Sequence, residues 1–221
     1  MDGKILKLRL KEIEDNVVTL AEMVIVAIKG SVEALKNRDL ALAEQIVADD
    51  AKINRKRFEI EEECIGLLKT ERLQESDLRL VVAVLNMIVD LERMGDHAEG
   101  IATIAVMMGR EPPLKPLIDI PRMAEKASDM LKRTMQAFTN RDIEAARKIP
   151  SEDDEIDALN NQVFRELLII MLELPAAIAR AEYLIWVAYN LERIADRVTN
   201  ICERVVFMIT GRMEEIKVSR Y

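Results

Sequence analysis

The stretch LERMGD at residues 91–96 returns as LERIAD at residues 191–196, which is 100 positions later. A second match, NRD at residues 37–39, returns at residues 140–142 with an offset of 103 positions. The segments IVADDAKIN and IPSEDDEID, which come after the first and second NRD, are also related. Because the three matches keep their order and nearly the same offset, they indicate an internal duplication.

The composition predicts that both copies are helical. The chain has 221 residues, of which 50% are apolar and 33% charged, with only 7 Gly and 6 Pro. A sheet protein needs turn residues far more often than that, and the remaining residues are mostly good helix formers. The one proline cluster, EPPLKP at 111–116, cannot continue a helix. We therefore expect a first repeat at 1–110, a linker at 111–116 and a second repeat at 117–221.

Each half divides into three helices. Asp39 and Asp142 of the two NRD turns can cap the helices that follow them, and Pro150 is expected to kink or split the fifth helix. The expected fold is all-α, with six long antiparallel helices that form two tandem, duplicated three-helix bundles. The expected helices span residues 4–36, 39–72, 77–109, 117–139, 142–173 and 176–210.

Charge and hydropathy exclude several classes of protein. The net charge is −8, whereas a nucleic-acid-binding protein carries a basic surplus or stripe. The two cysteines have neither metal-type spacing nor a disulfide framework. The sequence opens without a signal-peptide pattern, and its apolar stretches are far shorter than the ~20 residues that span a bilayer. We expect a soluble, cytoplasmic protein.

Acidic side chains recur on one face of the third helix in each half. Their spacing of four and three residues places them one turn apart on the same side. The face contains Glu92, Asp96 and Glu99 in the first half, and Glu192, Asp196, Thr199 or Asn200, and Glu203 in the second.

Such a face needs a compensating positive charge, because like charges at i and i+4 destabilise a helix by about 0.2–0.5 kcal/mol. Arg93 and Arg193 can supply it as salt bridges, which would leave a solvated face and nothing more. A multivalent cation can supply it more strongly, because hard cations bind clustered carboxylate oxygens. The duplication favours the metal, and the salt-bridged face stays open as the alternative.

Polar residues also interrupt the apolar stripe of the second helix in each half. Asp50 and Asp153 occupy the same place in the two stripes, and Asn54 and Asp157 lie one turn further on the same face. A helix N-terminus favours carboxylates, which accounts for Asp153 better than for Asp50.

Catalytic motifs are missing. With one histidine, His97, the chain cannot supply the Glu-x-x-His motifs on two helices that a di-iron carboxylate enzyme needs. Neither of the two Gly-rich phosphate-binding motifs, GxxxxGK[ST] and GxGxxG, occurs. We expect that the protein is not an enzyme, and a metal-dependent hydrolase of phosphate compounds ranks last among the hypotheses.

With LERMGDHAEGIA and LERIADRVTNICE each late in its half, the chain resembles the PhoU family of phosphate-signalling proteins. The resemblance covers essentially the whole chain, including the paired E(D)xxxD motifs and the D-x-x-I-[N/D] pattern on the preceding helix. It implies a cytoplasmic negative regulator that works with the phosphate-specific ABC transporter. The implied partners are the ATPase subunit of the transporter, which would bring the protein to the membrane periphery, and a phosphate-responsive sensor histidine kinase where one exists.

The resemblance also implies clusters of iron, zinc, manganese or magnesium on the acidic motifs. The two halves differ where Arg197 stands for His97 and Asn200 for Gly100, so the two sites are expected to differ in metal affinity or nuclearity. The implied ligands are Glu92, Asp96, Glu192 and Asp196, with Asp50, Asn54, Asp153 and Asp157 from the preceding helices, Glu99 and His97 beside the first site, and Asn200 and Glu203 beside the second.

Two other functions stay open from the sequence alone. One is a metal-free helical scaffold or dimerisation protein, in which the acids are salt-bridged. The other is an accessory protein of a phosphate cotransporter in place of the ABC system. Elongated bundles with apolar faces are also compatible with a homodimer.

Overall fold

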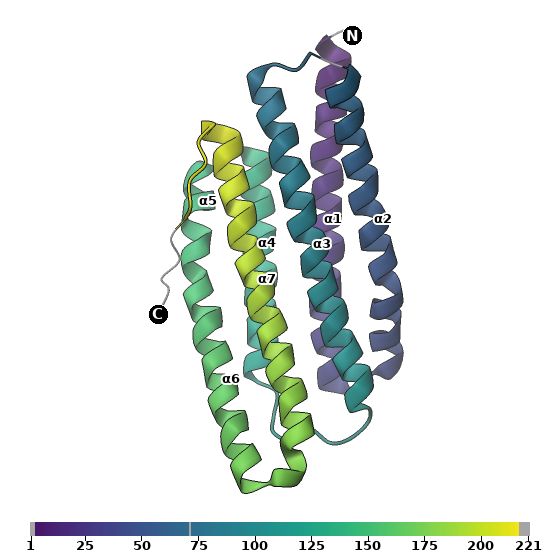
Figure 1. Ribbon diagram of the computed structural model, residues 1–221, viewed down its shortest axis with the longest axis vertical. Coiled ribbons are helices and arrows are strands. Elements are labelled where there is room, and N and C mark those ends of the chain that lie inside the picture. The colour runs from purple at the N-terminus through teal and green to yellow at the C-terminus, as the bar shows by residue number, and fades with distance from the viewer. Residues whose placement is uncertain (1–2, 71, 217–221) are drawn as a thin grey trace.

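The computed structural model describes residues 3–70 and 72–216, and every regular element within those ranges is a helix. Two three-helix bundles stand side by side with their helices along the long axis of the molecule (Figure 1), which confirms the expected all-α fold. The first bundle contains α1 (Gly3–Asn37), α2 (Leu40–Thr70) and α3 (Glu75–Met108). The second begins with α4 (Asp119–Asn140). Its next arm consists of three consecutive segments, α5 (Ile143–Lys148), η1 (Ile149–Glu152) and α6 (Asp153–Glu173), and the short η2 (Pro175–Ala177) then leads into α7 (Ile178–Thr210).

The two NRD turns have the same structure. Arg38 and Arg141 both adopt a left-handed backbone with φ of 57°, which lets the chain leave one helix and begin the next. The Oδ1 atoms of Asp39 and Asp142 then accept hydrogen bonds from the backbone N–H three residues on, at 3.1 and 3.0 Å. The predicted caps are confirmed, and they fix the same helix–helix corner in both repeats.

Pro150 interrupts the fifth expected helix, as predicted. The regular helix ends at Lys148, a 3-10 turn runs from Ile149 to Glu152, and α6 then begins at Asp153. The proline removes one backbone donor, and the tighter turn accommodates that loss. The other helix bounds lie within two residues of those expected, apart from residue 71, which is outside the described ranges.

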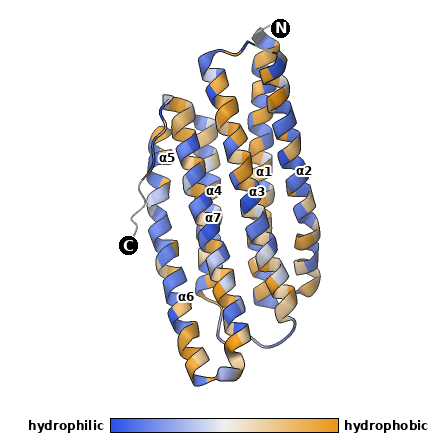
Figure 2. Cartoon of the chain, in the orientation of Figure 1, coloured by the Kyte–Doolittle hydropathy of each residue, from blue (hydrophilic) through white to orange (hydrophobic). Residues whose placement is uncertain are grey.

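The helices α3 and α7 form the centre of the molecule. Each packs within its own bundle and against the other, while α1 packs against α4. Leu91 and Leu191, which occupy the same place in the repeat, are both fully buried, and the buried apolar residues of both halves form one continuous cluster. Each helix also carries a hydrophilic face (Figure 2). Along the described ranges, no helix combines the length and the hydrophobicity needed to cross a bilayer.

Candidate metal centre

In the first repeat, Asp50 on α2 faces the acidic face of α3. Burial raises the pKa of Asp50, and the charges of Asp96, Glu99 and Glu92 raise it further. Asn54 donates a hydrogen bond from Nδ2 to Asp50 Oδ2 at 2.7 Å. The other oxygen, Asp50 Oδ1, is buried and accepts no hydrogen bond from the described residues. The structure therefore gathers these five residues at the contact of α2 with α3.

Gly95 permits that contact. A Cβ atom at this position would lie 3.1 Å from Ile53 Cγ2 and 3.5 Å from Asp50 Oδ1. A side chain here would therefore press on α2 and on the carboxylate that α2 carries. The equivalent residue in the second repeat is Ala195, so at this position the two interfaces differ by one methyl group.

Arginine partly neutralises the first face. Arg93 Nη1 lies 3.1 Å from Asp96 Oδ2, and Arg93 Nε lies 3.6 Å from Glu92 Oε2. The pKa of Glu92 is nevertheless raised, first by burial and then by the charge of Asp96. Glu99 accepts a hydrogen bond from Thr103 Oγ1 at 2.8 Å. Salt bridges are thus present, as the alternative interpretation expects, and they leave part of the repulsion in place.

The second repeat places Asp153 and Asp157 of α6 against Glu192 and Asp196 of α7. Asp153 is only 3% exposed. Burial, followed by the charges of Asp157, Asp196 and Glu192, raises its pKa to about 7. The pKa of Glu192 is likewise raised to about 7, by burial and then by Asp196, and that of Asp157 is raised by burial and by Asp196. Each face thus gathers four carboxylates, and the second face buries its Asp153 more deeply than the first face buries Asp50.

The second face also holds buried oxygens without donors. Asp153 Oδ1 and Glu192 Oε2 have no hydrogen-bond partner within the part of the chain that the structure describes. Arg193 pairs with Asp196, as Arg93 pairs with Asp96 in the first repeat. A buried carboxylate oxygen without a hydrogen-bond donor lowers the stability of the fold. A cation bound at this face would therefore stabilise the protein.

Three further residues named by the sequence are engaged elsewhere. Asn200 donates from Nδ2 to Asp90 Oδ1 at 3.2 Å. Glu203 accepts a hydrogen bond from the backbone N–H of Ile216 at 3.0 Å. His97 Nδ1 lies 2.8 Å from Asn190 Oδ1. The first and third of these contacts cross from one repeat to the other.

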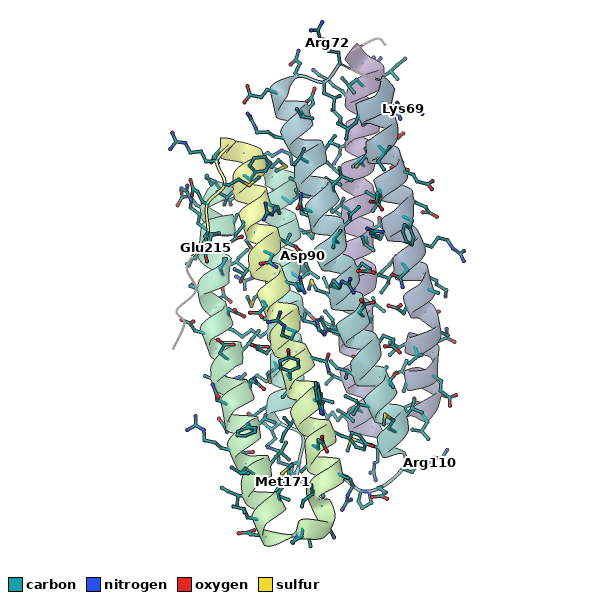
Figure 3. The ribbon with its side chains drawn as sticks, viewed as in Figure 1. Lys69, Arg72, Asp90, Arg110, Met171 and Glu215 are labelled. Atoms are coloured by element: carbon teal, nitrogen blue, oxygen red, sulfur yellow. The ribbon has the colours of Figure 1, made fainter. Side chains whose placement is uncertain are left out.

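Those contacts belong to a seam between α3 and α7. Asp90 is labelled in Figure 3, where the two helices run side by side. Its Oδ1 atom accepts a hydrogen bond from Arg197 Nη1 at 3.0 Å. The contact between His97 and Asn190 is its counterpart, because the offset of 100 positions relates Asp90 to Asn190 and His97 to Arg197. His97 and Arg197, which differ between the repeats, thus each make a contact that joins the two halves. Sequence reasoning missed Asp90 and Asn190, although each directly precedes a repeated LER motif.

The donor set suits hard cations, because carboxylate oxygens dominate both faces. The unpartnered oxygens of Asp50, Asp153 and Glu192 are the observation that fits a bound cation. Over residues 3–70 and 72–216, however, no three His, Cys, Asp or Glu side chains are arranged so that they could hold a metal ion as they stand. A metal at either face therefore requires the carboxylates to rotate toward a common point.

The fold and the two faces define a class: a duplicated three-helix bundle with carboxylates on the last two helices of each copy. The family model described as the PhoU domain matches residues 17–105 and 120–205, and the chain belongs to this family. It is 36% identical over 204 residues to the "phosphate-specific transport system accessory protein PhoU homolog" of Aquifex aeolicus, covering 92% of both chains. The protein of the same name from Clostridium acetobutylicum is 31% identical over 217 residues, with 98% of this chain and 99% of that one covered.

Solved structures agree with this assignment. PhoU from Pseudomonas aeruginosa superposes with a TM-score of 0.88 at 29% identity, covering 93% of this chain and 99% of that one. The phosphate transport system regulatory protein PhoU from Streptococcus pneumoniae also gives 0.88, at 30% identity, with 95% and 99% covered. The whole six-helix arrangement is therefore shared.

Proposed function

We propose that this protein is an accessory protein of a phosphate-specific transport system that binds metal at its two acidic faces and acts through contacts with other proteins. Membership of the PhoU family supports the link to phosphate transport. The observation that carries the metal is the buried, unpartnered carboxylate oxygens of Asp50, Asp153 and Glu192. Each is held beside further carboxylates, where a cation stabilises the charged form of all of them.

At each face, two neighbouring helices would supply the metal ligands. Glu92 and Asp96 of α3 with Asp50 of α2 would hold metal at the first face. Glu192 and Asp196 of α7, with Asp153 and Asp157 of α6, would hold it at the second. Iron, zinc, manganese or magnesium would supply the positive charge that the nearby arginines supply only in part. Asn200 and Glu203 would contribute only by leaving their present partners.

Elemental analysis of the purified protein, without a metal-binding affinity tag, tests the metal. The variants are Glu92→Ala/Asp96→Ala and Glu192→Ala/Asp196→Ala, and each is expected to lose the metal of its own face only. The matched control removes two exposed carboxylates, Glu62→Ala/Glu173→Ala, and keeps the wild-type content. Unchanged metal in both site variants would refute the site assignment.

The second part of the proposal concerns partners. The protein would act in the cytoplasm as a homodimer, contact the ATPase subunit of the phosphate ABC transporter and a sensor histidine kinase where one exists, and repress phosphate-starvation genes when phosphate is plentiful. Deletion of the gene is then expected to derepress a phosphate-starvation reporter in high phosphate. The ATPase subunit is expected to co-purify with the wild-type protein.

A metal-free scaffold is the second candidate, and the ion pairs of Arg93 with Asp96 and of Arg193 with Asp196 favour it. It predicts that protein purified without metal keeps its full stability in strong chelator and takes up no metal on reconstitution. A role beside a phosphate cotransporter makes the same structural demands, and the genes next to this one distinguish it from the ABC system.

A further inference from the structure

The two acidic faces contain the same number of carboxylates but differ in their cations. Four acids gather at each face, and each face has one arginine on its own long helix, Arg93 or Arg193, that pairs with an acid one turn further on. The first face has an additional cation, Arg57 of α2. The offset of 103 positions relates Arg57 to Asn160 of α6, so the second repeat carries a neutral side chain at that place.

The packing of α2 on α3 places Arg57 beside Glu92. The preceding residue of the same stripe, Ile53, packs on Gly95, where a Cβ atom would lie 3.1 Å from Ile53 Cγ2. Because α2 and α3 run antiparallel (Figure 1), one turn forward along α2 to Arg57 corresponds to about one turn back along α3 to Glu92. Burial and the charge of Asp96 raise the pKa of Glu92, and the charges of Arg93 and Arg57 oppose that rise.

Arg57 also has partners on its own helix. Its Nη1 atom lies 3.0 Å from Glu61 Oε2, and its guanidinium lies over the ring of Phe58, 4.7 Å from the centroid. Its Nε atom is buried and has no hydrogen-bond acceptor among the described residues. The counterparts of Glu61 and Phe58 are Phe164 and Asn161, so the second repeat carries neither the arginine nor these two partners. Arg57 thus lies between the acidic face and Glu61, with one donor still unused.

The second face keeps more of its repulsion. Burial and the charge of Asp196 raise the pKa of Glu192 to about 7, and Arg193 of the same helix opposes that rise. At the first face, arginines from two helices oppose the corresponding rise for Glu92. A cation bound at the second face would therefore relieve more repulsion than one bound at the first.

We infer that Arg57 is an internal counter-cation of the first face, which competes with metal for its carboxylates and makes this face the weaker of the two metal sites. A metal ion and a guanidinium held beside the same carboxylates repel each other, so metal at Glu92 would displace Arg57 toward Glu61. The second face, which has Asn160 at this place, would fill first. This inference rests on the proposed function, because it requires that both faces bind metal, and it adds the order in which they fill and the residue that sets the order.

Mn²⁺ binding to the full-length, metal-free protein tests this order, with the unbound ion measured by electron paramagnetic resonance. Each face is observed alone: the first-face protein carries Glu192→Ala/Asp196→Ala, and the second-face protein carries Glu92→Ala/Asp96→Ala. The first-face protein is expected to bind Mn²⁺ at least about tenfold more weakly than the second-face protein. Equal affinities, or tighter binding at the first face, would overturn the inference.

Substitutions of Arg57 in the first-face protein test whether its charge sets the difference. Arg57→Asn and Arg57→Met both remove the charge, and Met also keeps an apolar stem, so each is expected to tighten Mn²⁺ binding at least about tenfold. Arg57→Lys keeps the charge and should stay within about threefold of the unsubstituted affinity. The matched control, Arg55→Asn, removes an exposed positive charge from the same helix and should also stay within about threefold.

The reverse exchange is made in the second-face protein. Asn160→Arg copies Arg57 into the second repeat and is expected to weaken Mn²⁺ binding at least about tenfold. The role of Arg57 would be overturned if Arg57→Asn and Arg57→Met left the affinity unchanged, or if Arg57→Lys and Arg55→Asn tightened it as much as they do.

A double-mutant cycle of Arg57→Met with Glu92→Gln measures the same contact without metal. In strong chelator, the change in urea midpoint caused by Arg57→Met is expected to be less favourable by about 0.2–0.4 M when Glu92 is present than when it is replaced. Additive effects of the two substitutions would show that Arg57 does not compensate this face.

The outcomes separate this inference from the proposed function. If both proteins are folded by circular dichroism and neither binds Mn²⁺, the metal part of the proposed function fails, and this inference fails with it. If both faces bind Mn²⁺ with affinities that do not depend on residue 57 or residue 160, only this inference fails.

Discussion

Asp153 is expected to make the metal-free protein less stable as the pH rises, and Asp153→Asn should remove that effect. The pKa of Asp153 is raised from 3.8 to about 7 by burial and by the neighbouring carboxylates. In the unfolded chain the carboxyl returns to its ordinary value. Between about pH 4 and pH 7 the folded protein therefore holds a proton that the unfolded chain releases, so stability decreases as the pH increases.

The size of the effect follows from this difference in protonation. Each pH unit over which the folded state retains one extra proton lowers the free energy of unfolding by about 1.36 kcal/mol. From pH 5 to pH 7 the loss is about 2 to 3 kcal/mol at most, because Asp157, Asp196 and Glu192 share the repulsion. Contributions that do not change with pH cancel when the difference between variant and wild type is compared at two pH values.

Urea denaturation in the presence of a chelator, followed by far-UV circular dichroism at pH 5 and pH 8, measures this quantity. The advantage of Asp153→Asn over wild type is expected to grow by about 2 to 3 kcal/mol between the two pH values, or about 1 M in the urea midpoint. The control is Asp15→Asn, which removes a carboxylate that is 64% exposed and paired with Lys11. An advantage that changes by less than about 0.5 kcal/mol, or that shrinks at pH 8, would refute the reasoning.

Three further substitutions test the packing, each by urea denaturation at neutral pH. Gly95→Leu is expected to lower the free energy of unfolding by about 1–3 kcal/mol, since even a Cβ atom there meets Ile53 at 3.1 Å; unchanged stability would mean that α2 can move away. Arg197→Met removes the ion pair with Asp90 and leaves that carboxylate only the hydrogen bond from Asn200, which should lower the free energy of unfolding by about 1–3 kcal/mol. Unchanged stability would show that the seam does not depend on this pair. Phe138→Ala removes a fully buried ring and should cost about 3–5 kcal/mol, and a loss below about 1 kcal/mol would show that the cavity collapses.

The sequence predicted the helices well because local signals specify them. The two NRD turns, the proline cluster and Pro150 all act through the backbone of their own neighbours. The acidic faces were also predictable, because the 3.6-residue period alone places Glu92 with Asp96, and Glu192 with Asp196, on one side of a helix. The depth to which Asp153 is buried could not be predicted, although the stripe already placed it on the core side, since that depth depends on where α7 lies against α6.

Asn200 and Glu203 show why spacing alone was not sufficient. At about 100° per residue, Asn200 lies about 80° around the helix from Glu192, which is enough to turn it from α6 toward Asp90 on α3. Glu203 returns to nearly the same side, but about 16 Å further along the helix, where it meets the backbone of Ile216. A helix packed between two neighbours presents different residues to each, and only the assembled bundle determines which neighbour receives them.

The duplication explains why the two halves use similar acids in different ways. Both repeats place carboxylates on the same two helices, but the second repeat adds Lys126 and Arg133 beside its acids and buries them more deeply. The first repeat has neither cation and leaves an open cleft beside Asp50. At the matching place the first repeat has Lys52, which pairs with Asp49, the counterpart of Glu152. Lys126 and Arg133 pair with Glu152 and Glu155, whereas the pKa values of Asp153 and Glu192 stay raised to about 7. The acidic face between α6 and α7 is therefore not neutralised by the chain's own cations, and it is the face at which a bound metal would stabilise the fold most.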